Sequence, residues 1–134
     1  MKVQDVMKQA RFLGACEKSE KASTWKSLAW LLFSPQGREF CLNNKFPSLQ
    51  MFREIKDHMK PYRVYVEENA EYHNQDVAII GGGATLRFDK MRNFKVILMH
   101  GAIVNIEVSN YAVVLIESVD SEYIITNDGT GVIL

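Results

Sequence analysis

The sequence predicts an α+β protein, in which an N-terminal helical head, about residues 1–60, caps the first coil of a short C-terminal parallel β-solenoid, about residues 61–134. In the first part, apolar residues recur at spacings of three and four, which is typical of amphipathic helices. The second part repeats with a period of about 17 residues, and a fixed period of this size is typical of a solenoid. The boundary falls at Lys60-Pro61, and we expect both parts to form one compact unit.

The first and last helices of the head are predicted from single apolar faces. The first face is formed by Val3, Val6, Met7, Ala10 and Leu13. The last helix opens at Phe46-Pro47-Ser48 and ends at Pro61, because proline cannot continue a helix. Its apolar face is formed by Leu49, Phe52, Ile55 and Met59.

Two more helices are predicted between them. One begins after Ser23 or Thr24, which are good N-cap residues, and its apolar face is so wide that it should be buried or meet a partner. Ser34-Pro35 ends this helix and starts the next one, with Ser34 as the cap and Pro35 in the first helical position. That helix stops at Asn43-Asn44.

The repeat becomes visible when the second part is cut into rows of about 17 residues, which start near residues 60, 77, 94, 111 and 130. Two adjacent columns are aliphatic, and a third holds only Asp or Asn. The aliphatic columns are Ile79, Val96, Val113 and Val132, and Ile80, Ile97, Val114 and Ile133. Asp and Asn tolerate left-handed backbone and bond to neighbouring backbone groups, so they suit the corners of a coil. We therefore predict a structural corner ladder of Asp76, Asn93, Asn110 and Asn127.

An antiparallel meander is the alternative, because His100-Gly101 and Gly81-Gly82-Gly83 lie between apolar segments and could form hairpin turns. The Asp/Asn column favours the solenoid, since a meander has no reason for such a period. Adjacent columns point to opposite faces of a strand, so both faces of this sheet are apolar. The outer face should therefore be covered by the helices or by another subunit.

The composition is that of a globular protein: 134 residues, 47% hydrophobic and 24% charged. The presence of only two cysteines argues against a disulfide framework. No apolar segment approaches the length of a membrane span, and the N-terminal residues lack the apolar core of a signal peptide. We expect a cytoplasmic protein that does not bind membranes.

The net charge of zero hides an asymmetry. Residues 1–61 contain 11 Lys/Arg and 6 Asp/Glu, whereas residues 62–134 contain 5 and 10, which together give the 16 and 16 of the whole chain. The basic head, with Trp25 and Trp30, could bind nucleic acid. However, its charges alternate in sign, as in Glu17-Lys18-Ser19-Glu20-Lys21, which is more typical of a solvated helical surface.

No motif predicts catalytic, cofactor-binding or metal-binding residues. Gly81-Gly82-Gly83 lacks the spacing and the following helix of a phosphate-binding loop, and Asp128-Gly129-Thr130-Gly131 lacks the second loop of an acidic protease. Both are better explained as coil corners. The histidines have no metal-ligand spacing, and Cys41 between Phe40 and Leu42 is typical of a buried small hydrophobe. The six-residue step of the left-handed β-helix acyltransferases is absent.

The segments GREFCLNNKFPSLQMFREIKD, KVILMHGA and NYAVV resemble a group of short, uncharacterised bacterial proteins of mobile-element or prophage type. The resemblance covers roughly residues 35–115. It implies no activity, ligand or catalytic residue.

These patterns favour a non-enzymatic interaction or structural module that binds itself or another protein. An open coil leaves a strand edge unpaired and apolar side chains exposed, so Val132, Ile133 and Leu134 are the candidate interface of a homo-oligomer. The first alternative is a nucleic-acid-binding accessory protein that uses the basic head. A small enzyme with its site between head and coils is the second.

Overall fold

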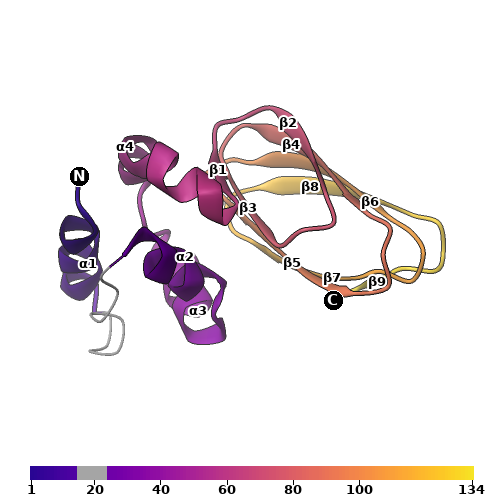
Figure 1. The fold of residues 1–134 in the computed structure, drawn as a ribbon, viewed down its shortest axis with the longest axis horizontal. Coiled ribbons are helices and arrows are strands. Elements are labelled where there is room, and N and C mark those ends of the chain that lie inside the picture. Colours follow the sequence, from indigo (N-terminus) through magenta and orange to yellow (C-terminus); the bar gives the residue numbers. More distant parts are fainter. Residues whose placement is uncertain (15–23) are drawn as a thin grey trace. The chain divides into compact units, whose positions relative to one another are not determined.

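A computed structural model describes residues 1–14 and 24–134 of the chain (Figure 1). The chain divides into two compact units, Met1–Val64 and Tyr65–Leu134, and the boundary lies slightly after the predicted one at residue 60. We call them the helical unit and the solenoid unit. The candidate cap Ser23, together with Cys16, Lys18 and Lys21, lies outside the described residues.

The helical unit contains the four predicted helices, and short polar side chains cap three of them. Thr24 Oγ1 accepts a hydrogen bond from Ser27 N–H at 3.1 Å, Ser34 caps the helix that Pro35 opens, and Ser48 caps the last one. The elements are α1 (Val3–Phe12), α2 (Trp25–Phe33), α3 (Pro35–Asn44), α4 (Leu49–Met59) and the 3₁₀ turn η2 (Lys60–Tyr62).

The predicted apolar faces of α1 and α4 are buried, apart from their ends. In α2, which packs against α3 and α4, Leu28, Ala29 and Leu32 are buried, but the side of the helix that bears Trp30 is not. Trp30 is 68% exposed, so this helix is buried on one side only. Its wide apolar face therefore leaves a large aromatic side chain in solvent.

The solenoid unit confirms the predicted fold class and excludes the meander, because every described strand pair is parallel (Figure 1). Consecutive strands alternate between two sheets, with the orders β1-β3-β5-β7-β9 and β2-β4-β6-β8. The strands are β1 (Val64–Val66), β2 (Ala70–His73), β3 (Val77–Ile80), β4 (Gly83–Phe88), β5 (Asn93–Met99), β6 (Ile103–Val108), β7 (Val113–Ser118), β8 (Glu122–Asn127) and β9 (Val132–Ile133).

The predicted period is too short, and most of the column register is wrong with it. Val77 pairs with Val96 and Val113 with Val132, which is a spacing of about 19 residues. The spacing also varies, since Asn93 pairs with Val113 across a longer coil and Ala70 with Ala84 across a much shorter one. Of the predicted aliphatic neighbours, only Val113 with Val132 and Val114 with Ile133 pair as expected. Side chains alternate along a strand, so an apolar strand shifted by two residues shows the same pattern. Rows of a fixed length of about 17 residues therefore align the wrong partners.

A column of left-handed residues marks the corners that follow β1, β3, β5 and β7, the first four strands of the five-stranded sheet. The column is Glu67, Gly81, His100 and Asp120, with φ angles of 53°, 65°, 58° and 51°. Neighbouring corners are joined by backbone hydrogen bonds, for example from Glu67 N–H to Ile80 C=O at 2.8 Å. The prediction that Gly81-Gly82-Gly83 forms a coil corner is therefore confirmed, and His100-Gly101 is also a corner of a parallel coil and not the hairpin turn of the meander.

Gly82 is required at its corner for two separate reasons. Its φ of 63° is left-handed, and a Cβ there would lie 3.0 Å from Glu67 Cα in the coil below. A side chain at this position would therefore combine a strained backbone with crowding against the neighbouring corner.

The solenoid core lies between the two sheets. Phe88 and Phe94 are in contact there, with ring centroids 4.8 Å apart. The opposite face of the five-stranded sheet also carries fully buried side chains, namely Ala78, Ile80, Ile97 and Met99. Burial on both faces explains why two adjacent sequence columns are aliphatic.

Candidate functional site

The four residues of the predicted corner ladder do not stack on one another. Asn93 pairs with Val113, and Asn127 pairs with Val108 in the other sheet. Asp76 precedes β3, whereas Asn110 lies in a turn after β6 with a φ of 51°. The residues were aligned by a period that the coils do not have, so the ladder prediction is wrong.

Individually, Asp76 and Asn127 still bind neighbouring backbone groups through their side chains. Asp76 Oδ1 accepts a hydrogen bond from Lys95 N–H at 2.9 Å, which joins two successive coils. The Asn127 side chain holds its own turn, since its Oδ1 accepts from the N–H groups of Gly129 and Gly131 at 3.0 and 3.1 Å. The physical role assigned to Asp and Asn is therefore present without the stacking.

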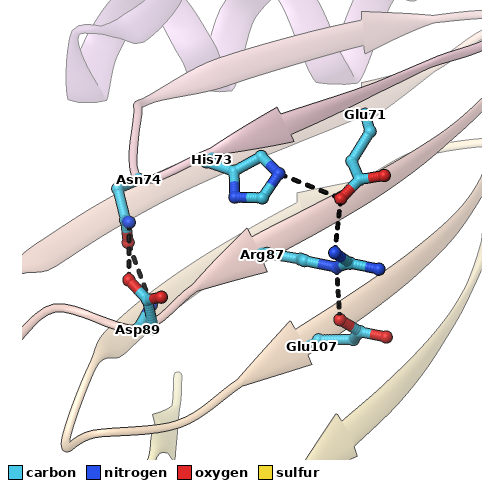
Figure 2. A network of polar contacts seen from close by, with 6 residues as sticks. All are labelled: Glu71, His73, Asn74, Arg87, Asp89 and Glu107. Atoms are coloured by element: carbon cyan, nitrogen blue, oxygen red, sulfur yellow. Dashed lines mark hydrogen bonds and ion pairs between the residues drawn. The ribbon is translucent and has the colours of Figure 1, made fainter.

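A side-chain link between corners exists elsewhere, at the end of the four-stranded sheet. Asn74 Nδ2 donates to Asp89 Oδ1 at 2.6 Å, and Asp89 N–H donates to Asn74 Oδ1 at 2.9 Å (Figure 2). The signal that could have found this link is the polar residue directly after the second apolar segment of each coil. Because the coils differ in length, no fixed period displays it.

Sequence reasoning also missed a row of charges on the outer face of the four-stranded sheet. His73, Arg87 and Glu107 lie opposite one another on β2, β4 and β6. The Arg87 guanidinium contacts Glu71 Oε1 and Glu107 Oε2, both at 2.6 Å, and His73 Nε2 lies 2.9 Å from the same Glu71 oxygen (Figure 2). We call Glu71, His73, Arg87 and Glu107 the charged row.

The charged row joins three successive coils through one cation between two carboxylates. Its side chains are 43–52% exposed, so water and salt screen the attraction and its contribution to stability is modest. A row of this kind holds the register of the strands, since a shift by one residue would turn Arg87 to the opposite face.

Replacing Arg87 with glutamine is expected to lower the free energy of unfolding by about 1 kcal/mol in low salt. The change leaves Glu71 and Glu107 without the cation between them. Urea unfolding at two salt concentrations measures the effect, and most of it should vanish at about 1 M salt. The control is Lys90→Gln, which removes an equal charge from an exposed position. An equal loss in both variants would contradict a specific role for the row.

Among the described residues, the groups that could support covalent or metal chemistry do not assemble. Burial raises the pKa of the Cys41 thiol to about 12, so the thiol stays protonated and is a poor nucleophile. The His58 ring stacks on Trp25 with centroids 4.6 Å apart. Within residues 1–14 and 24–134, no three His, Cys, Asp or Glu side chains gather as metal ligands would.

The candidate interface residues lie at the end of the solenoid, in what we call the last coil (β7, β8, β9 and their turns). Val132 and Leu134 are 47% and 65% exposed, whereas Ile133 is half-buried against the core. The Val132 N–H donates to the C=O of Ala112, directly before β7, and the Leu134 N–H donates to the C=O of Val114 in β7, both at 2.9 Å. The exposed residues therefore sit on a fixed backbone.

Exposed apolar side chains of the last coil also lie on β8, which the sequence pattern does not indicate. β8 is the last strand of the four-stranded sheet and pairs with β6 on one side. Ile124 is 70% exposed on its outer face and Tyr123 is 42% exposed. Single exposed apolar residues are common, whereas contiguous exposed apolar patches are typical of interaction sites.

In the part of the chain that the structure describes, every helix is too short or too polar to cross a bilayer. Comparison with protein-family models, with curated proteins and with solved structures gives no match for this chain.

Proposed function

We propose that the protein is a non-enzymatic interaction module that self-associates through its last coil. The observation that carries the proposal is that the exposed edge of β8 lies together with exposed apolar side chains at one end of the solenoid. The side chains are Tyr111, Tyr123, Ile124, Val132 and Leu134, exposed by 63%, 42%, 70%, 47% and 65%. Covering such a surface is favourable because it removes apolar area from water.

The charges favour a contact between the acidic C-terminal part of one chain and the basic N-terminal part of another. After Lys95 the sequence contains five Asp/Glu and no Lys/Arg, whereas residues 1–61 carry an excess of five positive charges. On α2, Lys26 and Trp30 are four residues apart and both exposed, so one face of the helix presents a cation beside a large aromatic ring. Such a face complements an acidic and apolar strand end in charge and in character.

Nucleic acid is the less favoured partner. The exposed surface of α4 places Arg53 and Lys56 directly beside Glu54 and Asp57. The carboxylates would repel the phosphate backbone that the basic residues attract. A continuous basic stripe, which would favour this function, is therefore interrupted on this helix.

Light scattering on the purified chain tests self-association, and we expect oligomers at about 100 μM that dissociate on dilution or in high salt. Ile124→Lys should shift the protein towards the monomer, because it places a charge in the apolar part of the surface. The matched control is Met91→Lys, since Met91 is 77% exposed in the turn between β4 and β5 and lies outside the last coil. A monomeric wild-type protein at this concentration would contradict the proposal.

A further inference from the structure

The free edge of β8 presents backbone groups in a defined pattern. Glu122 N–H donates to Ala102 C=O at 2.9 Å and Asp128 N–H to Val108 C=O at 3.2 Å, so the even-numbered residues bond to β6. Successive residues of a strand direct their N–H and C=O groups to opposite edges. The N–H and C=O groups of Tyr123, Ile125 and Asn127 therefore point away from β6, to the side where the described residues place no strand.

The side chains along this edge alternate in the same way. Tyr123 and Ile125 are paired with Val104 and Ile106, which are buried in the core, so they face the interior of the coil. Ile125 is only half-buried, because no further coil of the described chain covers it. Ile124 lies on the outer face. A segment added beside β8 would therefore find apolar neighbours on both of its faces.

Both ends of this edge carry a carboxylate. β8 begins at Glu122, which is exposed, and is followed by Asp128, which is fully exposed. Hydrogen bonds from Thr130 lower the pKa of Asp128, so this group stays ionised. An extended segment of matching length would bring its two ends near these charges.

We propose that the edge of β8 binds an extended segment of another protein by strand addition, and that this segment carries apolar side chains in its middle and Lys or Arg at both ends. The proposal rests on the proposed function, since it names the class of partner that fits the last coil. Main-chain hydrogen bonds would hold the segment, and the side-chain positions would select it.

A second copy of the solenoid unit is a poorer occupant of the same edge. Among the described strands, β2 is the other edge of the four-stranded sheet, and it carries Glu71 and follows Glu67 and Glu68. Pairing β8 with β2 of a second copy, or with a second β8, would bring carboxylates together. A basic segment avoids this repulsion.

The test uses fluorescence anisotropy with the full chain and two labelled synthetic peptides. Each peptide has about seven residues, to match a strand of ordinary length, with Val and Ile in the middle and either Lys or Glu at both ends. We expect the Lys peptide to bind at least about tenfold more tightly than the Glu peptide, and its affinity to fall as salt is added.

A pair of variants isolates the backbone contribution. Tyr123→Ala removes the side chain but keeps the N–H that points to the free edge, whereas Tyr123→Pro removes both. Proline is tolerated where the N–H faces solvent on an edge strand. We expect the proline variant to bind the Lys peptide about five- to tenfold more weakly than the alanine variant. Equal affinities, with both variants folded by circular dichroism, would overturn the proposal.

Should the proline variant fail to fold, Glu122→Lys decides the question, because it reverses one end charge at an exposed position. It should shift the preference towards the Glu peptide by several-fold, and an unchanged preference would overturn the proposal.

The two proposals fail separately. If neither peptide binds but the chain self-associates and Ile124→Lys prevents it, strand addition alone is wrong. If the Lys peptide binds to a chain that stays monomeric, self-association alone is wrong.

Discussion

Replacing Phe94 with alanine is expected to lower the free energy of unfolding of the solenoid unit by about 3–5 kcal/mol. Phe94 is 1% exposed, its ring lies against Phe88, and the Arg92 guanidinium lies 5.0 Å from the ring centroid. Truncation would leave a cavity in the core between the two sheets, where neighbours cannot close in without breaking strand pairs.

Urea unfolding, monitored through amide hydrogen exchange in the solenoid strands, measures this loss of stability. Met91→Ala is the matched control, because Met91 is nearby in the sequence and 77% exposed, and it should change stability by less than about 0.5 kcal/mol. If Phe94→Ala were no more harmful than this control, Phe94 would not belong to the core.

Replacing Gly37 with alanine is expected to destabilise the helical unit by about 3 kcal/mol. A Cβ at this position would overlap the backbone C=O of Leu31 and crowd the Ser34 hydroxyl. That hydroxyl accepts a hydrogen bond from Gly37 N–H at 3.2 Å and donates to Leu31 C=O at 2.8 Å, so it ties the end of α2 to the start of α3. The backbone cannot yield without opening this joint.

The hydrogen-exchange rates of the α2 and α3 amides measure this loss of stability. In Gly37→Ala these rates should increase far more than the exchange rates of the solenoid strands. Gln36→Ala is the control, since Gln36 is exposed in the first turn of the same helix. Unchanged protection in Gly37→Ala would show that α2 and α3 meet at a wider angle than the structure has.

The helices could be predicted closely because their signals are local. Ser34, Pro35 and Ser48 act within one turn of their own positions, so the sequence alone specifies where α3 and α4 begin. The exposure of Trp30 could not be predicted, because it depends on which side of α2 packs against α3 and α4.

The solenoid could be recognised from recurring aliphatic segments, but its register could not be assigned. Register depends on the length of each corner, and the coil from Ala70 to Ala84 is clearly shorter than that from Val77 to Val96. The ion pairs of Arg87 reach back to Glu71 and forward to Glu107 over unequal separations, so no constant spacing reveals them. The edge of β8 could not be predicted for the same reason, because the second apolar segment begins at a different position in each row of about 17 residues.

Each coil of the solenoid unit pairs only with the coil before it and the coil after it, and this pattern determines how the unit assembles. Each strand pair closes a loop of one coil, about 14–20 residues, so the entropy of closure is small and nearly equal at every step. The unit can therefore grow in one dimension, each finished coil acting as the template for the next. Among the described strands, β8 of the last coil has a neighbour on one side only, and a coil paired on one side frays more readily than one paired on both. Whatever binds to its edge supplies the missing neighbour, so occupancy and local order of this coil are thermodynamically linked.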